Sequence, residues 1–274
     1  MSQTIGSTVK LNNGVEMPWL GLGVWQLSTK ETIESVSHAL KFGYRHIDTA
    51  TLYGNESEVG LAVRKSGIPR DQVFVTTKLW NNDHGRDRAP RAFMESYKEL
   101  DLGPIDLYLI HWPVEGDRHQ TWDALLKVHQ EGKCRALGVS NYTIKHLEEL
   151  LERTSMAPAV NQVEFHPFLY QKELLEFCRK HKIQLEAYSP LIKGSRLNDP
   201  KLVEFATRYK RSPAQICIRW AIQHEVVVIP KSCHKGRIEE NGTVFDFKLS
   251  AKDMAAIDAL NEDFRCTWDP SNTP

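Results

Sequence analysis

The chain alternates between two patterns of hydrophobic and polar positions. Short runs rich in β-branched residues are separated by longer segments whose apolar residues recur on one helical face, as Ile33, Val36 and Leu40 do, and as Leu147 and Leu150 do. We expect these helical stripes to pack into the core rather than to bind a ligand. The pattern predicts a strand and then a helix, repeated, with strands at 19–23, 45–48, 73–78, 105–111, 134–140, 159–164, 184–188 and 226–230.

These elements predict one closed α/β domain. Residues 8–17 contain an Asn13-Gly14 turn typical of a β-hairpin, and residues 251–260 predict an extra helix after the last strand. The tail at 261–274 is polar and contains proline. No linker, charge run or low-complexity segment marks a boundary, so we expect residues 1–274 to form a single (β/α)8 TIM barrel with an N-terminal hairpin and a C-terminal helix.

Composition narrows the classes of function. Of the 274 residues, 41% are hydrophobic and 26% are charged, which suits a globular protein with a large core. Lys+Arg and Asp+Glu both total 35, which argues against nonspecific nucleic-acid binding. No segment is typical of a signal peptide or a membrane span. We expect a cytoplasmic monomer with no membrane partner.

The cysteines give no sign of a metal site or a disulfide framework. They are odd in number and lack the close pairs that mark zinc sites and redox dithiols. We expect them to be reduced and structural, and we expect no metal. They are Cys134, Cys178, Cys217, Cys233 and Cys266.

Polar residues end nearly every predicted strand. In barrel enzymes the carboxyl ends of the strands build the active site. Singly, each has an ordinary explanation: Asp48 as a turn cap, His111 as a core histidine, Lys78 as a side chain reaching solvent. Their joint position favours a functional rim, made of Asp48, Lys78, His111, Ser140, Asn141, Gln162, Glu164, Tyr188 and, after the last strand, Lys231.

Three of these residues, together with Tyr53, suit the reduction of a carbonyl group. Tyr53 follows the second strand and offers a phenol as proton donor, whose pKa a nearby Lys78 ammonium would lower. Asp48 would neutralise that lysine inside the barrel mouth. A neutral His111 imidazole would hydrogen-bond the carbonyl oxygen and hold it against the tyrosine.

Carbonyl reduction also requires hydride, which side chains do not carry, so a nicotinamide cofactor is expected. The Gly21-Leu22-Gly23 segment stops short of the Gly-x-Gly-x-x-Gly dinucleotide fingerprint. We therefore expect the cofactor in the barrel mouth, with the ring stacked on Tyr188. Its carboxamide would be held by Ser140, Asn141 and Gln162.

The segment after the last strand could bind a phosphate. Lys231 and Arg237 flank the start of a short predicted helix, an arrangement that suits an anion. A solvated basic turn, with Arg237 paired to a helix carboxylate, explains the same segment equally well.

Seven separated motifs carry a family resemblance. They are GYRHIDT at 43–49 with YGNE at 53–56, TKLW at 77–80, DLYLIHWP at 106–113, GVSN at 138–141, NQVE at 161–164, YSPL at 188–191 and IPKS at 229–232. The chain resembles the aldo-keto reductases, most closely small bacterial and protozoan members such as diketogluconate and methylglyoxal reductases. Many small members carry tryptophan where this chain has Tyr188.

The resemblance implies a catalytic tetrad of Asp48, Tyr53, Lys78 and His111, and NADP(H) as cofactor with its 2′-phosphate on Lys231 and Arg237. It implies a substrate pocket lined by Trp25, Trp80 and Trp112, open because the tail is short. It also implies cofactor contacts at Gly23, Val24, Ser140, Asn141, Gln162, Tyr188, Ser189, Leu191, Lys231, Ser232, Arg237, Glu240 and Asn241.

Two other functions fit parts of the pattern. A class I aldolase would use Lys78 as a Schiff base, but it leaves Tyr188 and the segment around Lys231 without a role. A noncatalytic subunit that senses NADPH would need no complete tetrad. The sequence favours an NADPH-dependent reductase of small aldehydes and ketones with broad specificity.

Overall fold

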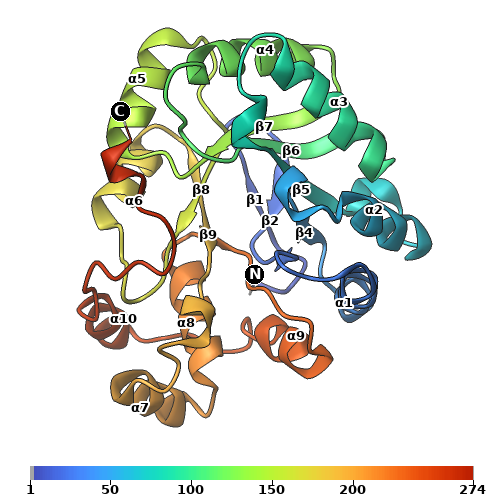
Figure 1. The fold of residues 1–274 in the computed structure, drawn as a ribbon. Helices are drawn as coiled ribbons and strands as arrows, with labels where there is room; N and C mark the ends of the chain where they lie inside the picture. Colours follow the sequence, from blue (N-terminus) through green and yellow to red (C-terminus); the bar gives the residue numbers. More distant parts are fainter. Residues whose placement is uncertain (1–2, 274) are drawn as a thin grey trace.

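Eight parallel strands form the centre of the molecule, with helices around them (Figure 1). The computed structural model describes residues 3–273. The strands follow one another around the sheet in chain order. They are β3 (Leu22–Gly23), β4 (His46–Asp48), β5 (Phe74–Leu79), β6 (Ile105–Ile110), β7 (Cys134–Ser140), β8 (Val160–Glu164), β9 (Gln184–Tyr188) and β10 (Val227–Val228).

The first and last strands join, so the sheet closes into a barrel. Parallel bridges pair Leu20 with Val228 and Gly23 with Lys231. The Gly21 amide donates to the Val228 carbonyl oxygen at 2.9 Å. A Cβ at Gly21 would lie 2.6 Å from the His46 imidazole, so glycine permits the close approach at this seam. The predicted (β/α)8 barrel is confirmed, although β3 and β10 are shorter than the predicted runs.

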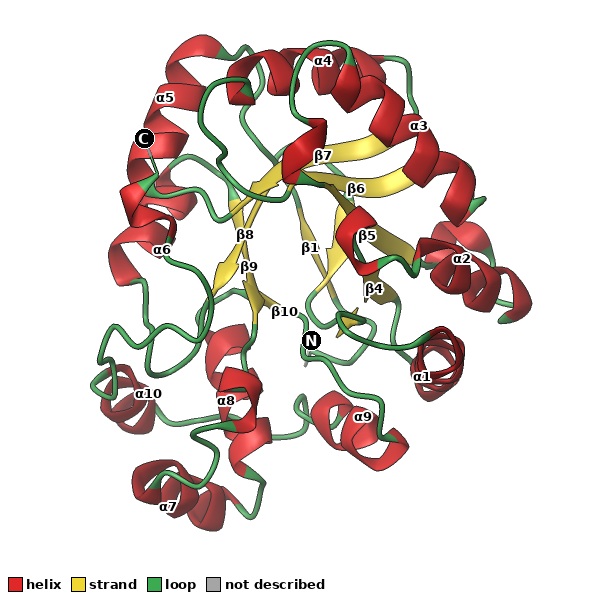
Figure 2. Ribbon diagram, viewed as in Figure 1, coloured by secondary structure: helices red, strands yellow, loops and turns green. Residues whose placement is uncertain are grey.

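Helices cover the outside of the barrel (Figure 2). Side chains of Ser28, Thr143 and Ser212 cap three of them through reciprocal capping boxes. The helices are α1 (Thr29–Phe42), α2 (Glu56–Lys65), α3 (Arg88–Leu100), α4 (Arg118–Gln130), α5 (Ile144–Arg153), α6 (Lys172–Lys180), α7 (Pro200–Tyr209), α8 (Pro213–Gln223), α9 (Lys235–Gly242) and α10 (Ala251–Asp258). The predicted extra helix is α10, whereas α7, inserted between β9 and α8, was not identified from the sequence.

A hairpin closes the amino-terminal end of the barrel. Strands β1 (Thr8–Lys10) and β2 (Glu16–Pro18) pair antiparallel, as predicted. Side-chain amides in the turn donate to backbone carbonyls at the starts of two strands, from Asn12 to Pro158 at 3.1 Å and from Asn13 to Arg135 at 3.0 Å. The hairpin buries Met17 completely against apolar residues inside the barrel. The opposite, carboxyl-terminal end is thus left for a site.

Two further predictions concern the whole chain. All five cysteines are unpaired. Within residues 3–273, no helix is both long enough and apolar enough to cross a membrane.

Candidate active site

The carboxyl-terminal rim of β4, β5 and β6 brings together the four residues expected to carry the chemistry. Asp48 ends β4, Lys78 lies in β5, and His111 follows β6. Tyr53 ends a short 3-10 turn, Thr51–Tyr53, and the Thr51 hydroxyl donates to the Lys78 carbonyl oxygen at 2.9 Å. This bond fixes the turn over β5, so the phenol faces the lysine.

Lys78 is fully buried and surrounded by oxygen atoms. Its Nζ donates to Asp48 Oδ1 at 2.7 Å, to the Thr49 carbonyl oxygen at 2.9 Å, and to the Tyr53 hydroxyl at 3.5 Å. Burial acts to lower the pKa of Lys78, but its acidic neighbours, chiefly Asp48, together outweigh burial and raise that pKa. The lysine is therefore an ammonium, in the ion pair that the sequence led us to expect.

The pKa of Tyr53 corrects one expectation. Burial raises it above the usual tyrosine value, and the Lys78 ammonium opposes this without reversing it. The loss of water around the buried phenol therefore has a larger effect on this pKa than the neighbouring ammonium. The Tyr53 hydroxyl is consequently protonated at neutral pH, as a proton donor must be.

His111 lies beside Tyr53, with ring centroids 5.9 Å apart in an edge-on arrangement. Burial, assisted by the Lys78 charge, lowers the pKa of His111 well below the usual histidine value. The imidazole is therefore neutral, as expected. Its Nδ1 is buried and has no hydrogen-bond partner in the described chain.

Glu186 supplies a second buried carboxyl group close to Asp48, and its role was not predicted from the sequence. Gln162 Nε2 donates to Asp48 Oδ2 and to Glu186 Oε2, both at 2.8 Å. Burial and the nearby Asp48 charge raise the pKa of Glu186 to about 8. Glu186 lies two residues before Tyr188 on one strand, so period-two alternation could have placed it inside. The Gln162 amide nitrogen is thus engaged by two buried carboxyl groups of the barrel interior.

Two of the residues expected to hold a carboxamide, Ser140 and Asn141, lie at the end of β7, and Asn141 contacts Tyr188 at the end of β9. Asn141 Nδ2 donates to the His111 carbonyl oxygen at 2.9 Å and to Ser140 Oγ at 3.0 Å. The Tyr188 hydroxyl lies 2.8 Å from Asn141 Oδ1 and 2.9 Å from Thr267 Oγ1. The half-buried Tyr188 ring is held at its hydroxyl end by two elements. Thr267 was missed because no local pattern links the tail to β9.

The other expected cofactor residues lie along the seam between β3 and β10 and in the segments after β9 and β10. Lys231 bridges to Gly23 across the seam. Lys231 and Arg237 are both exposed. Neither makes an ion pair or a side-chain hydrogen bond with residues 3–273, so the alternative in which Arg237 pairs with a helix carboxylate is not observed.

The remaining residues expected to contact the cofactor differ in burial and backbone conformation. Val24, Ser232 and Asn241 are buried, Leu191 is half-buried, and Ser189 has a left-handed backbone with φ of 49°. The Glu240 carboxylate accepts a hydrogen bond from the hydroxyl of Ser212, the N-cap residue of α8. Its carboxylate is thus already engaged by the protein.

The three tryptophans expected in a substrate pocket lie at different depths around the rim. Trp80 and Trp112 flank His111, with ring centroids 5.2 Å and 6.3 Å from the imidazole. Trp25 is 39% exposed and stacks under the Lys193 ammonium. A fourth tryptophan, Trp268 in the tail, was not predicted from the sequence to line this pocket; its ring centroid lies 4.7 Å from that of Trp112.

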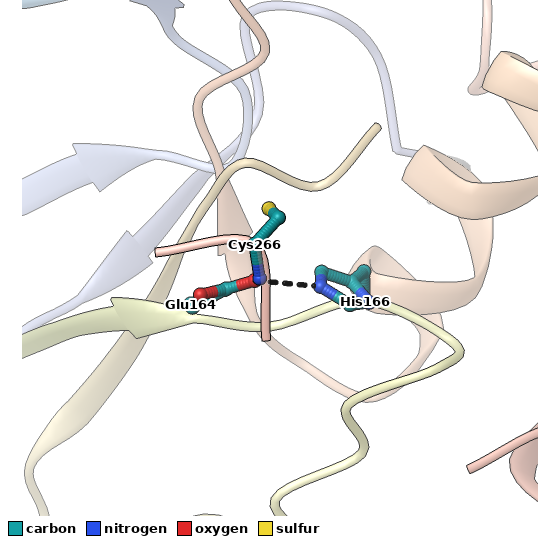
Figure 3. A group of neighbouring side chains, drawn as sticks. All are labelled: Glu164, His166 and Cys266. Carbon is teal, nitrogen blue, oxygen red and sulfur yellow. Dashed lines mark hydrogen bonds and ion pairs between the residues drawn. The ribbon is translucent and has the colours of Figure 1, made fainter. Parts of the chain in front are cut away.

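The end of β8 carries a cluster of Glu164, His166 and Cys266 (Figure 3). Their potential ligand atoms lie within 4.8 Å of one another. The Glu164 carboxylate already accepts hydrogen bonds from His166 Nε2 at 3.0 Å, from the Cys266 amide at 2.7 Å, and from the amide and hydroxyl of Thr267. Burial raises the pKa of Cys266 to about 12, which keeps the thiol protonated. This arrangement is a clamp on the tail rather than a set of free ligands.

Comparison with known proteins identifies the family to which the chain belongs. The family model described as "Aldo/keto reductase family" matches residues 19–262. The chain belongs to the aldo/keto reductase family. The resemblance inferred from the motifs is thus confirmed, and so is the prediction of an oxidoreductase.

Individual members of the aldo/keto reductase family match over nearly their whole length. A glyoxal reductase of Bacillus subtilis (strain 168) is 50% identical over 271 residues, which cover 98% of each chain. Methylglyoxal reductase DkgA of Escherichia coli (strain K12) is 43% identical over 268 residues, 96% of this chain and 97% of that one. The crystal structure of a Bombyx mori aldo-keto reductase in complex with NADP has a TM-score of 0.91 and 35% identity, covering 97% of this chain and 95% of that chain.

Proposed function

We propose that this protein reduces small aldehydes and ketones to alcohols with NADPH, and that Tyr53 is the general acid. The observation that carries the proposal is the contact of the Tyr53 hydroxyl with the buried Lys78 ammonium, 3.5 Å away, beside a neutral His111. The names of the glyoxal and methylglyoxal reductases that resemble this chain support small carbonyl compounds as substrates.

The chain's residues suit NADPH in type and position. Exposed Lys231 and Arg237 are free to bind the 2′-phosphate, and the half-buried Tyr188 ring offers a face for the nicotinamide. The NADP complex of the Bombyx mori relative supports the same choice. When bound, NADPH supplies the hydride that the protein lacks.

Protons move through the chain's own groups. As hydride reaches the carbonyl carbon, the oxygen gains negative charge and takes the proton of Tyr53. The resulting phenolate is stabilised by the Lys78 ammonium, which Asp48 keeps charged. Neutral His111 holds the carbonyl oxygen near the phenol by a hydrogen bond and, being uncharged, does not compete with Tyr53 to protonate that oxygen. The tryptophans around His111 shield the substrate side from water.

The geometry disfavours the aldolase alternative. A Schiff base needs a neutral amine with a free lone pair, whereas Lys78 is an ammonium that donates to three oxygen atoms. A noncatalytic subunit that senses NADPH would bind the nucleotide but would not reduce a carbonyl compound. Turnover therefore distinguishes it from the proposed reductase.

Replacement of Tyr53 tests the general acid. In Tyr53→Phe we expect the rate of methylglyoxal reduction to fall by about 100-fold or more, because proton donation is lost while the ring remains. The dissociation constant for NADPH, measured by quenching of protein fluorescence, should change less than about 2-fold. Turnover equal to wild type would reject Tyr53 as the acid, and NADPH binding without turnover of any carbonyl by the wild type would favour the sensing subunit.

A further inference from the structure

The hydroxyl of Tyr188 has more acceptors than hydrogens. It lies 2.8 Å from Asn141 Oδ1 and 2.9 Å from Thr267 Oγ1, and a phenol carries one hydrogen. Which neighbour receives it depends on whether either of them can donate instead. The other hydrogen bonds of Asn141 and Thr267 show whether each can donate to the Tyr188 hydroxyl.

Thr267 is an acceptor toward Tyr188. Its one hydroxyl hydrogen is directed to Glu164 Oε2. Burial acts to raise the pKa of Glu164, but hydrogen bonds from His166, Cys266 and Thr267 outweigh it and lower the pKa to about 2. An ionised carboxylate accepts hydrogen bonds and donates none. Only a lone pair of Thr267 Oγ1 is therefore left for the phenol.

Asn141 is also an acceptor toward Tyr188. Its amide nitrogen faces the His111 carbonyl oxygen at 2.9 Å, a group that accepts only. The other hydrogen of that nitrogen faces Ser140 Oγ at 3.0 Å, whose own hydrogen is donated to the Gln162 carbonyl oxygen. The oxygen of Asn141 is thereby fixed toward Tyr188. The single phenol hydrogen is shared by two acceptors of nearly equal distance.

We propose that Thr267 is a positioning residue that takes the Tyr188 hydrogen when a nicotinamide binds, and so frees Asn141 Oδ1 to accept from the carboxamide NH2. The proposal rests on the proposed function, in which Asn141 holds the carboxamide. Glu164 orients the Thr267 hydroxyl so that its oxygen can accept the Tyr188 hydrogen. The tail therefore contributes a residue to the cofactor site. Without Thr267, the Tyr188 hydrogen would stay on Asn141 Oδ1 and occupy one of its two lone pairs, which makes this oxygen a weaker acceptor for the carboxamide.

The test is nucleotide binding by Thr267 and Tyr188 variants, measured by quenching of protein fluorescence. In Thr267→Val the dissociation constants for NADPH and NADH should both rise by about 3- to 10-fold, the effect of one hydrogen bond. The rise should be equal for the two nucleotides because both carry the carboxamide. Thr267→Ser keeps the hydroxyl and should bind within about 2-fold of wild type.

A double-mutant cycle separates this role from simple support of the tail. Tyr188→Phe keeps the ring and removes the shared hydrogen, so Thr267→Val added to it should change either dissociation constant by less than about 2-fold. The same loss in both backgrounds, or no loss in Thr267→Val, would overturn the inference while leaving the reductase proposal intact. If the wild type bound neither nucleotide, both proposals would fail.

Discussion

At the scale of single residues, the site is governed by the charge state of buried groups. Lys78 is an ammonium in a position without solvent because Asp48 lies 2.7 Å away, and Asp48 is in turn held by Gln162. His111 is neutral because burial and the same ammonium disfavour a second positive charge. Burial is thus the main cause of the protonation state of both groups that would face a carbonyl oxygen; the Lys78 charge assists it at His111 and opposes it at Tyr53.

Arg237 is the residue that we propose distinguishes the two nicotinamide cofactors. In Arg237→Ala we expect NADPH binding to weaken by about 1.5 to 3 kcal/mol, the contribution of a hydrogen bond between charged groups. NADH binding should stay almost constant, because NADH lacks the 2′-phosphate. Titration of both cofactors by fluorescence measures the difference.

Thr243→Ala is a suitable control for this substitution, since Thr243 lies at the end of the same helix and is exposed. It should leave both affinities unchanged. Equal losses for NADPH and NADH in Arg237→Ala would contradict the phosphate role.

At the scale of elements, one carboxylate at the end of β8 holds two successive residues of the tail. Glu164 accepts hydrogen bonds from the backbone amides of Cys266 and Thr267. A second tie comes from Lys193, whose ammonium donates to the Cys266 carbonyl oxygen at 2.8 Å. The chain after α10 therefore returns to the barrel rim instead of projecting into solvent.

Acid should release this segment before the barrel unfolds. The pKa of Glu164 is lowered to about 2 in the folded protein, so its contribution is complete above the ordinary value near 4.5 and is lost as pH falls toward 2. Between pH 5 and pH 3, hydrogen-exchange protection of the Cys266 and Thr267 amides, corrected for intrinsic exchange, should fall by roughly 20-fold. Glu164→Gln should show weak protection already at pH 7. Protection independent of pH in the wild type would argue against the clamp.

Most elements were predictable from sequence because their signals are local. Alternation of residue types predicted β7 and β9 with the observed bounds, and the polar ends of β4, β5 and β6 predicted where the rim residues gather. The strands at the seam are shorter than expected, since Leu20 and Gly23 meet the last strand through isolated bridges rather than a continuous ladder.

The contacts that could not be predicted join segments distant in the chain. The bond between Tyr188 and Thr267 depends on how the tail folds back, and no local period encodes that path. The net pKa of Tyr53 depends on the degree of burial, which the identity of its neighbours does not reveal. The inward turn of Gln162 likewise required the position of Glu186.

At the scale of the whole molecule, support and chemistry occupy opposite ends of the barrel. The hairpin closes the amino-terminal end with buried Leu11 and Met17, while the proposed catalytic groups lie at the carboxyl-terminal rim. The two ends are connected by strands whose interior is packed. Changes at the closed end should therefore alter stability without altering the site.

Met17→Ala tests this separation. Met17 is fully buried, so its truncation leaves a cavity and should reduce the free energy of unfolding by about 2 to 5 kcal/mol. The dissociation constant for NADPH should remain within about 2-fold of wild type, because the substituted residue does not reach the rim. Chemical denaturation and fluorescence titration provide the two values. A large change in affinity with little change in stability would contradict the division.

The order of the proposed roles along the chain has a consequence for how such an enzyme can diversify. Asp48, Tyr53, Lys78 and His111 lie in or directly after the consecutive strands β4, β5 and β6 in the first half of the chain, whereas most residues proposed to bind the nucleotide come from β7 onward. Recombination at the boundary between β6 and β7 would replace most of the residues proposed to bind the nucleotide and keep all four proposed catalytic residues. A lineage could in this way acquire a new preference for its electron carrier without rebuilding the acid that completes the reduction.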